Sequence, residues 1–374
     1  MRKIKVLHCV GRMDRGGLET FIMNIYRNID KELIQFDFLV SSNQPGDFNE
    51  EIRALGGEIY FIPNPRRAQD FLKYYKKLKA LIFSNNYEVV HSHVMFFSGM
   101  NALIAKNSKV PVIISHSHNI SDSKEDTFIR NSYRKFFRKL ILKNSTHLLG
   151  CSKEAITYLF NDLNDPRILD VKNGIYVEEF IKPLSISNRK KYLDEIGIPN
   201  NSKLVGHIGR FHHQKNHLFL IDIFKEISKM DDDYYLILVG KGDLEDKIKN
   251  KVVNLGLESK IKFLGVRDDI EKIIKLFDVF CFPSQYEGLG IVLIEAQAAG
   301  IPCFVSDTIP YEAEMDPDIY KRLPLNKEPE YWANTIINTD MRKSLNSYKK
   351  VIIKGYSIEE TVKTLESLYL RENI

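Results

Sequence analysis

Short apolar runs alternate with longer helical patterns along almost the whole chain, and this alternation constrains the fold more than any other feature. The runs are rich in Val, Ile, Leu and Phe with little polar alternation, which is typical of strands buried on both faces of a parallel sheet. Parallel neighbours need crossover connections, and the helical patterns supply them. We therefore predict an α/β fold made of two doubly wound, Rossmann-like units.

Two series of strands define the two expected units. The first unit should contain strands Ile4–Val10, Phe36–Val40, Glu58–Ile62, Val89–Ser92, Val112–Ser115 and His147–Gly150, with helices over Leu18–Asn28, Ala68–Asn85 and Asp126–Lys143. The second should contain strands Leu204–Gly209, Tyr234–Gly240, Ile261–Leu264, Val279–Phe282 and Cys303–Ser306, with helices over His217–Lys229, Leu244–Leu255 and Ile291–Ala299. We place the domains at residues 1–180 and 181–355, with a final amphipathic helix in 356–374.

Composition indicates a large intracellular enzyme. The length of 374 residues suggests two or three domains, each able to bury a proper core, and the four cysteines lack paired metal-ligand spacing. No stretch is long enough to span a bilayer, and the apolar part of the N-terminal segment is too short for a signal peptide. These features predict a cytoplasmic protein with reduced cysteines. Residues 1–185 carry a net charge of +7 and the remainder −2, so the first half is the basic half.

Two glutamates eight residues apart mark the most informative segment for function. Glu287 follows the strand Val279–Phe282 at its carboxyl edge, where open α/β sheets bind ligands. Glu295 is expected near the start of the following helix. The intervening Gly288-Leu289-Gly290-Ile291 offers backbone N–H groups beside a helix N-terminus, which favours an anion. Ionised carboxylates accept hydrogen bonds from sugar and ribose hydroxyls. A chance pair of glutamates is the alternative.

A second segment supplies cations. Gly209-Arg210 follows a strand, and Lys215 lies just before the next helix. A bidentate Arg and a compact Lys suit the developing charge of a diphosphate leaving group. The alternative is an ordinary solvated basic loop.

Gly16-Gly17 and two histidine pairs lie at strand ends of the first unit. The two glycines open a helix after the first strand, although their spacing is wrong for a dinucleotide fingerprint. The histidines are His91 with His93 and His116 with His118, each pair at the expected carboxyl end of a strand. A single buried histidine is more often structural than catalytic, but two adjacent pairs are harder to explain in that way.

Together these segments resemble the E-x7-E, Gly-Arg…Lys and Gly-Gly-x-Glu motifs of the retaining glycosyltransferases of family 4, which have the GT-B fold. The resemblance covers essentially the whole chain. It implies that Arg210 and Lys215 hold the diphosphate, Glu287 binds and assists the reacting sugar, and Glu295 holds the ribose. It also implies that the final helix crosses back onto the first, acceptor-binding domain, while the second domain binds the nucleotide sugar.

The resemblance assigns further positions of the cleft. Gly16, Gly17, Gly209, Gly240 and the backbone of 287–291 are expected to line the donor site, and the base to rest near Val266 and Arg267. Family members have an essential histidine after the strand matching Val112–Ser115. We favour His118 for that catalytic position, with His116 as a second donor contact and His93 as a weaker candidate for acceptor contact.

The function implied is retaining transfer of a sugar from a nucleoside-diphosphate sugar, expected to be a UDP-sugar, to a glycan or lipid-linked acceptor in bacterial surface polysaccharide or capsule synthesis. No cofactor or metal is expected, because Asp231-Asp232-Asp233 falls at the amino edge of a strand. Two alternatives stay open. A nucleotide-sugar epimerase would share the fold and donor site, and a non-catalytic GT-B partner subunit would have lost donor binding.

One helix also suggests where the protein works. Asp126–Lys143 carries Arg130, Arg134 and Arg138 at intervals of four, with Lys135 and Lys139 beside them. Basic residues near an anionic leaflet contribute about 1 kcal/mol each to binding. The helix therefore suggests peripheral attachment to the inner face of the plasma membrane, with an ordinary surface helix as the alternative.

Overall fold

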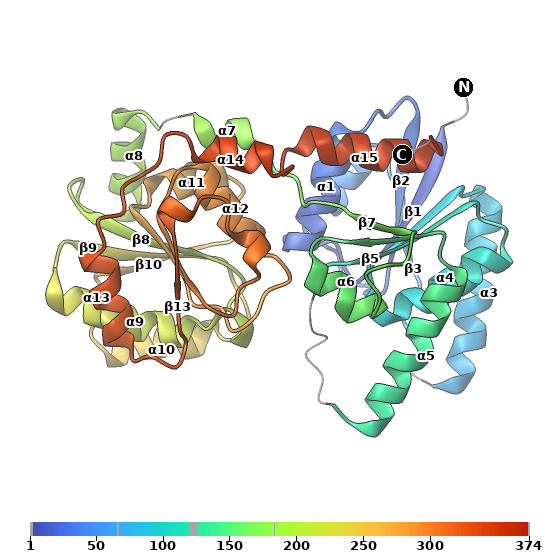
Figure 1. The fold of residues 1–374 in the computed structure, drawn as a ribbon, viewed down its shortest axis with the longest axis horizontal. Coiled ribbons are helices and arrows are strands. Elements are labelled where there is room, and N and C mark those ends of the chain that lie inside the picture. Colours follow the sequence, from blue (N-terminus) through green and yellow to red (C-terminus); the bar gives the residue numbers. More distant parts are fainter. Residues whose placement is uncertain (1–2, 66, 120–125, 183, 373–374) are drawn as a thin grey trace. The chain divides into compact units, whose positions relative to one another are not determined.

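The computed structural model describes residues 3–65, 67–119, 126–182 and 184–372 of the chain. The chain divides into two compact units, one comprising Met1–Gly174 with Ile358–Ile374 and the other Ile175–Ser357. Each unit is built on one parallel sheet flanked by helices (Figure 1), and the predicted fold class is confirmed. Of the predicted C-terminal segment 356–374, residues 373–374 lie outside the described ranges.

The sheet of the first unit has the order β3-β2-β1-β4-β5-β6-β7. Its strands are β1 (Ile4–Val10), β2 (Ile34–Val40), β3 (Ile59–Phe61), β4 (Val89–Ser92), β5 (Val112–Ser117), β6 (His147–Gly150) and β7 (Ile168–Asp170). Its helices include α1 (Gly17–Asn28), α2 (Asn49–Ala54), α3 (Ala68–Asn85), α4 (Ser98–Asn107), α5 (Phe128–Asn144), α6 (Lys153–Phe160) and α15 (Ile358–Leu370), with a short η1 (Met95–Phe97) before α4.

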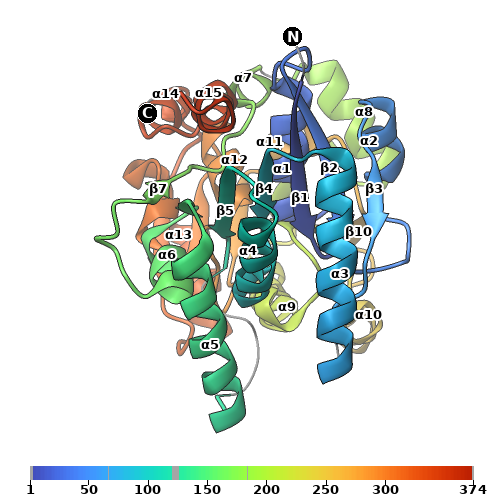
Figure 2. The same ribbon diagram turned by 90° about the vertical axis from the view of Figure 1, so that its right-hand side faces the viewer.

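The two faces of this sheet are covered by different helices. On one face, Leu7 packs with Leu78 of α3 and Ile104 of α4 in a single apolar cluster, and Figure 2 shows both helices in front of the strands. On the other face α1 and α15 lie side by side. The α15 helix is held there by Glu366, whose carboxylate accepts a 2.7 Å hydrogen bond from the Asp30 N–H. The last helix of the chain thus completes the first unit.

The sheet of the second unit has the order β10-β9-β8-β11-β12-β13. Its strands are β8 (Lys203–Ile208), β9 (Tyr234–Val239), β10 (Ile261–Gly265), β11 (Val279–Phe282), β12 (Cys303–Ser306) and β13 (Tyr320–Leu323). Its helices include α7 (Val177–Ile181), α8 (Ile186–Ile196), α9 (His217–Met230), α10 (Glu245–Asn254), α11 (Ile270–Leu276), α12 (Ile291–Ala298), α13 (Pro329–Asn338) and α14 (Ser347–Ile353), with the short turns η2 (His213–Lys215), η3 (Tyr311–Ala313) and η4 (Pro317–Ile319). The helices α9, α10 and α13 bury one face, with Trp332 and Phe224 fully enclosed.

The strand order reverses between β1 and β4 in the first unit and between β8 and β11 in the second. Ligands of open α/β sheets bind outside the carboxyl ends of the strands at such a reversal. Each unit therefore has one edge where function is expected.

Two strands were not predicted from the sequence, and several others begin or end one or two residues from their predicted bounds. The strands β7 and β13 were not predicted, because each is a short edge strand with exposed polar positions and gives no continuous apolar run. In addition β5 runs two residues past the predicted end at Ser115, since His116 and Ser117 still pair with β6. His116 is therefore inside a strand and not in the loop that follows it.

Candidate functional site

An ion pair occupies the carboxyl edge of β8 and β11 in the second unit. The Lys215 ammonium Nζ lies 2.8 Å from Glu287 Oε1, and the two side chains are only 17% and 8% exposed. The same ammonium lies 4.6 Å from the centre of the Phe282 ring at the end of β11. Burial would penalise either charge alone, so each group compensates the other.

One side-chain and one backbone hydrogen bond, both to carbonyl groups, join the two loops that carry this pair. The Gln214 amide Nε2 donates to the Tyr286 carbonyl at 2.9 Å, and the Gln285 N–H donates to the Gln214 carbonyl at 2.8 Å. These bonds fix residues adjacent in sequence to Lys215 and Glu287. The backbone positions of Lys215 and Glu287 are therefore fixed by contacts between the two loops.

Arg210 is arranged differently from Lys215. Its side chain is exposed, and no described group forms an ion pair or hydrogen bond with its guanidinium. A free guanidinium beside a compensated ammonium can accept an anionic ligand without first breaking an internal contact. The fork of five N–H donors suits two phosphate oxygens at once.

The loop after β9 requires a glycine at position 240. Its φ is +133°, and a Cβ atom there would lie 2.2 Å from the Gly209 carbonyl oxygen. The Gly209 N–H in turn donates to the Val239 carbonyl at 2.9 Å. The loops after β8 and β9 thus pack backbone against backbone. This packing is a sufficient reason for the glycine whether or not a ligand also approaches it.

Glu295 is the fifth residue of α12 and lies inside the helix near its N-terminal end, where the sequence prediction placed it. The helix starts at Gly290, which has φ +82° and is the N-cap. Glu295 is half-buried, and burial, with a smaller effect of the nearby Glu271 charge, raises its pKa to about 7. No described group donates a hydrogen bond to its carboxylate. A hydrogen bond donated by a bound ligand would stabilise the ionised form of the Glu295 carboxylate.

Val266 and Arg267 follow β10 at the same edge of the sheet. The Val266 side chain is exposed, whereas Arg267 Nη2 is held 2.8 Å from Asp269 Oδ2. Tyr192 also donates its hydroxyl to Asp269, at 2.9 Å. Arg267 is thus engaged within the unit, and contact with a base would involve Val266 or the backbone.

Five histidines gather at the corresponding edge of the first unit, on one face of its sheet. His8 of β1 is directly opposite His91 of β4, and the β4–β5 register places His93 beside His116. His118 follows β5 on the same face, because side chains alternate with period two. The face is the one covered by α1 and α15, since Phe21 contacts His116 and Tyr369 contacts His91.

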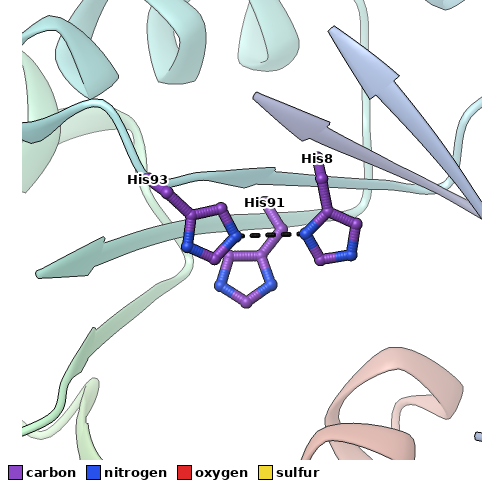
Figure 3. A group of neighbouring side chains, drawn as sticks. All are labelled: His8, His91 and His93. Carbon is purple, nitrogen blue, oxygen red and sulfur yellow. Dashed lines mark hydrogen bonds between the residues drawn. The ribbon is translucent and has the colours of Figure 1, made fainter. Parts of the chain in front are cut away.

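The imidazoles form two hydrogen-bonded chains. In the first, His118 Nε2 lies 2.9 Å from His93 Nδ1, and His93 Nε2 lies 3.1 Å from His8 Nδ1. Figure 3 shows the bond between His93 and His8. In the second, the Tyr369 hydroxyl lies 2.8 Å from His91 Nδ1, and His91 Nε2 lies 3.1 Å from His116 Nδ1. Burial lowers the pKa of all five histidines, to about 3 for His8 and His118, so all are neutral near pH 7.

Two triads of these histidines are close enough to hold a metal ion. His8, His91 and His93 form one, and His93, His116 and His118 the other, with ligand nitrogens within 4.8 Å of each other. Neither triad contains a carboxylate or thiolate, so a dication there would lack any compensating charge. The nitrogens also already bond to one another. Within the described residues these are the candidate metal-binding groups, and neither includes a residue of the Asp231-Asp232-Asp233 run considered from the sequence.

The Gly16-Gly17 loop ends at the start of α1, as predicted. Gly16 is the N-cap with an extended conformation, and a Cβ atom on Gly17 would meet nothing within 4 Å. Phe21, one turn into the same helix, contacts both His116 and His118. The glycine loop and the histidines therefore belong to one region of the first unit.

Sequence reasoning found Arg210, Lys215, Glu287 and Glu295, and the structure places all four at one edge of the second unit. It did not find Gln214 or His8. Gln214 had no distinguishing signal, because its contribution is a tertiary contact between loops. His8 also gave no signal of this kind, because its position opposite His91 depends on the register between β1 and β4.

Comparison with known proteins gives a consistent picture. Residues 15–179 match the family model described as Glycosyltransferase Family 4, and residues 188–318 match Glycosyl transferases group 1. A protein described as putative glycosyltransferase EpsF of Bacillus subtilis is 34% identical over 98% of this chain and 96% of its own length.

Two further relatives and one solved structure have informative descriptions. The capsular polysaccharide biosynthesis glycosyltransferase CapH of Staphylococcus aureus is 29% identical, covering 99% of this chain and all of that protein. An Escherichia coli UDP-Gal:alpha-D-GlcNAc-diphosphoundecaprenol alpha-1,3-galactosyltransferase is 25% identical, covering 98% and 97%. Anabaena Alr3699/HepE, solved with UDP and glucose, superimposes with a TM-score of 0.79 at 17% identity, covering 97% and 98%, which shows similarity of fold.

Proposed function

The chain belongs to the family 4 glycosyltransferases of GT-B fold, and we propose that it is a retaining enzyme that transfers a sugar from a UDP-sugar to a glycan or lipid-linked acceptor. The observation that carries this proposal is the edge of β8 and β11, where the free Arg210 lies in the loop that leads to the buried Lys215–Glu287 pair. We assign donor binding to this second unit and acceptor binding to the first.

The ion pair gives Lys215 and Glu287 linked roles. A bound diphosphate brings negative charge that competes with Glu287 for the Lys215 ammonium. Glu287 is then released to accept hydrogen bonds from sugar hydroxyls and to support positive charge developing at the anomeric carbon. Arg210 and Lys215 stabilise the departing diphosphate, which takes the proton of the acceptor on the same face of the sugar.

Other residues are assigned to the ribose, the base, the phosphates and the sugar of the donor. Glu295 accepts hydrogen bonds from the ribose hydroxyls, the base rests near Val266, and the backbone N–H groups of 288–291 face the phosphates. His118, with Gly16 and Gly17, contributes from the first unit. We place His118 ahead of His116 because His118 is half-buried whereas His116 is fully buried in β5. Both ring nitrogens of His93 are bonded to other histidines, which argues against its direct contact with an acceptor.

Neutralisation by fixed cations removes the need for a metal ion in this proposal. We further infer a role in polysaccharide or capsule synthesis, with support from the described activities of the CapH and diphosphoundecaprenol-dependent relatives. The latter also supports a UDP-sugar donor and a lipid-linked acceptor.

A donor screen that measures release of UDP or GDP, combined with calorimetric UDP binding, tests the proposal. Glu295→Ala should weaken UDP binding, whereas Glu287→Ala should lower kcat and kcat/KM together and leave UDP binding nearly intact. Collapse of UDP affinity in Glu287→Ala alone would reverse the two roles. Absence of UDP binding in the wild type would favour a non-catalytic partner, and epimerised free donor would favour an epimerase.

The exposed face of α5 supports attachment to a membrane surface. Phe128, Ile129 and Phe136 are 86%, 81% and 59% exposed, with Lys135 and Lys139 also exposed between and beside them. Two of the three arginines expected for this role are engaged within the protein. Arg138 donates to the Leu159 and Tyr158 carbonyls, and Arg134 pairs with Asp126. An apolar and basic face of this kind suits insertion at an anionic interface.

Flotation with liposomes of phosphatidylglycerol tests this attachment. We expect binding at low salt that is lost in a Phe128→Ser/Ile129→Ser/Phe136→Ser variant and weakened in Lys135→Glu/Lys139→Glu, with Arg138→Gln folded less stably but still bound. Failure of the wild type to bind would end the membrane proposal and leave the transferase proposal untouched. No helix among the described residues meets the length and hydrophobicity needed to cross a membrane.

A further inference from the structure

Lys241 lies in the loop that follows β9, the strand between β8 and β10 in the sheet of the second unit. The loop after β8 carries Arg210, and the loop after β10 carries Val266. The three strands are parallel, so their carboxyl ends lie at the same edge of the sheet. Lys241 is therefore placed between the loop assigned to the diphosphate and the loop assigned to the base.

Backbone contacts fix this loop to both of its neighbours. The Gly240 N–H donates to the Gly265 carbonyl at 2.8 Å, and the Phe211 N–H donates to the Lys241 carbonyl at 2.9 Å. A Cβ atom on Gly242 would lie 2.4 Å from the Phe211 carbonyl oxygen, so the loop is also packed closely against that backbone. The main chain of Lys241 is thus held in place by contacts that do not involve its side chain.

The Lys241 side chain reaches the loop after β10. A Cβ atom built on Gly265 would lie 3.6 Å from Lys241 Cε, which is ordinary van der Waals contact. The aliphatic part of Lys241 therefore lies against Gly265, the residue before the exposed Val266. The side chain is exposed, and no described group forms an ion pair or hydrogen bond with its ammonium. Since Arg267 in the same region is paired with Asp269, Lys241 supplies the free positive charge beside the base loop.

We propose that Lys241 is a donor-binding residue whose ammonium donates a hydrogen bond to a carbonyl oxygen of the uracil ring. An ammonium only donates, so it suits a base that presents carbonyl oxygens, as uracil does and adenine does not. A phosphate oxygen is the other acceptor that a nucleotide offers, but the contact of Lys241 Cε with Gly265 favours the base. This assignment rests on the proposed function, in which the donor is a UDP-sugar and its base lies near Val266.

Binding of UDP and of uridine to full-length Lys241→Met tests the contact, because uridine has the base without the diphosphate. Methionine keeps an unbranched side chain to pack against Gly265 but has neither charge nor N–H. We expect both ligands to bind about tenfold more weakly, the effect of losing one hydrogen bond from a charged group at an exposed site. Lys241→Arg retains N–H donors and should bind both ligands nearly as well as the wild type. Calorimetry measures UDP binding, and competition against UDP measures uridine binding.

Arg210→Met is the matched control in the neighbouring loop. It should weaken binding of UDP and leave binding of uridine unchanged, because its guanidinium is assigned to the diphosphate. Weaker binding of UDP alone in Lys241→Met would place the ammonium on a phosphate and overturn the proposal. Unchanged binding of both ligands would overturn it too, as would a wild type that binds UDP but not millimolar uridine. Thermal unfolding of Lys241→Met should match the wild type, since Lys241 has no polar partner to lose.

The same titrations separate this proposal from the proposed function. If Arg210→Met weakens UDP binding while Lys241→Met changes neither ligand, the donor site stands and only the assignment of Lys241 is wrong. If Lys241→Met weakens both ligands while Arg210→Met weakens neither, the base contact stands and the assignment of Arg210 to the diphosphate is wrong. A wild type that binds neither UDP nor uridine would overturn both.

Discussion

The two units share a strand order but differ in the chemistry of their functional edges. The order β3-β2-β1-β4-β5-β6 of the first is repeated as β10-β9-β8-β11-β12-β13 in the second. Even the fifth residue of the central strand is a buried histidine in both, His8 in β1 and His207 in β8. His8 joins four other imidazoles, whereas His207 bonds through Nδ1 to the Cys281 carbonyl at 2.9 Å.

This difference shows how one scaffold can hold two kinds of site. At the edge of the second unit Arg210, Lys215 and Glu287 are charged groups and Glu295 is a carboxyl group with a raised pKa, which together suit a diphosphate and hydroxyl groups. At the edge of the first unit the histidines are neutral because burial lowers their pKa. Such groups can orient a hydrogen bond without attracting a competing ion. The fold supplies the edge, and the side chains at the strand ends supply the chemistry.

The largest expected effect is at the charged edge. Arg210→Ala or Lys215→Ala should lower kcat by ~10²–10³, the range for loss of one preorganised charge donor. Lys203→Ala is a matched control. Lys203 lies at the amino end of β8, the strand that precedes Arg210, and pairs there with Asp231, so its replacement should leave kcat unchanged. EDTA should have little effect on steady-state rates, and strict dependence on Mg²⁺ or Mn²⁺ would contradict the metal-independent mechanism.

The next largest effect compares glycine-to-alanine substitutions in the two units by their effect on the free energy of unfolding. Gly240→Ala forces a Cβ to 2.2 Å from a carbonyl oxygen at φ +133°, so we expect a loss of about 3 kcal/mol in the free energy of unfolding. Gly17→Ala, with open space around its Cβ, should change it by less than about 0.5 kcal/mol. Urea unfolding measures both. If Gly17→Ala is stable but inactive, a ligand must approach that loop closely. If it is fully active, the assignment of Gly17 to the donor site is wrong.

A pH dependence should follow from Glu295. Its pKa is raised to about 7 in the folded state from an ordinary value of 4.5, so the folded state binds more protons between these values. The contribution of Glu295 to stability should then be greatest below about pH 4.5 and fall by ~2 kcal/mol as pH rises through 7, once partial exposure is allowed for. Glu295→Gln should remove this slope in urea unfolding at a series of pH values.

Ligand binding should show the opposite trend. Ribose hydroxyls bind the ionised carboxylate, so affinity for a UDP-sugar should rise with pH through about 7 in the wild type and stay flat in Glu295→Gln. A flat wild-type profile by calorimetry would show that the ribose does not contact Glu295.

The smallest effect compares the two central histidines. His207→Phe removes one hydrogen bond and should cost about 1 kcal/mol of unfolding free energy. His8→Phe removes one bond from a connected chain, so we expect it to cost more by about 1 kcal/mol. Equal losses in urea unfolding would mean that the histidines of the first unit act as independent pairs.

Several features could be predicted from the sequence because their causes are local. Apolar runs and helical periodicity predicted Val89–Ser92, His147–Gly150 and Ala68–Asn85 with the observed bounds. The edge strands β7 and β13 were missed, because a strand with a single neighbour can be short and polar. Motif spacing also indicated Arg210, Lys215, Glu287 and Glu295, since these residues follow or flank recognisable strand ends.

The sequence by itself determined the parallel α/β class, the family and the charged residues at the strand ends. Only the tertiary structure decided which charges are free. It joins Lys215 to Glu287 and leaves Arg210 exposed, and it directs Arg138 of α5 to carbonyl groups instead of outward. It also brings His8 into one chain with His93 and His118, residues some 85 to 110 positions further along the chain. Hydrogen bonding and burial depend on neighbours that are distant in sequence, and no local pattern encodes them.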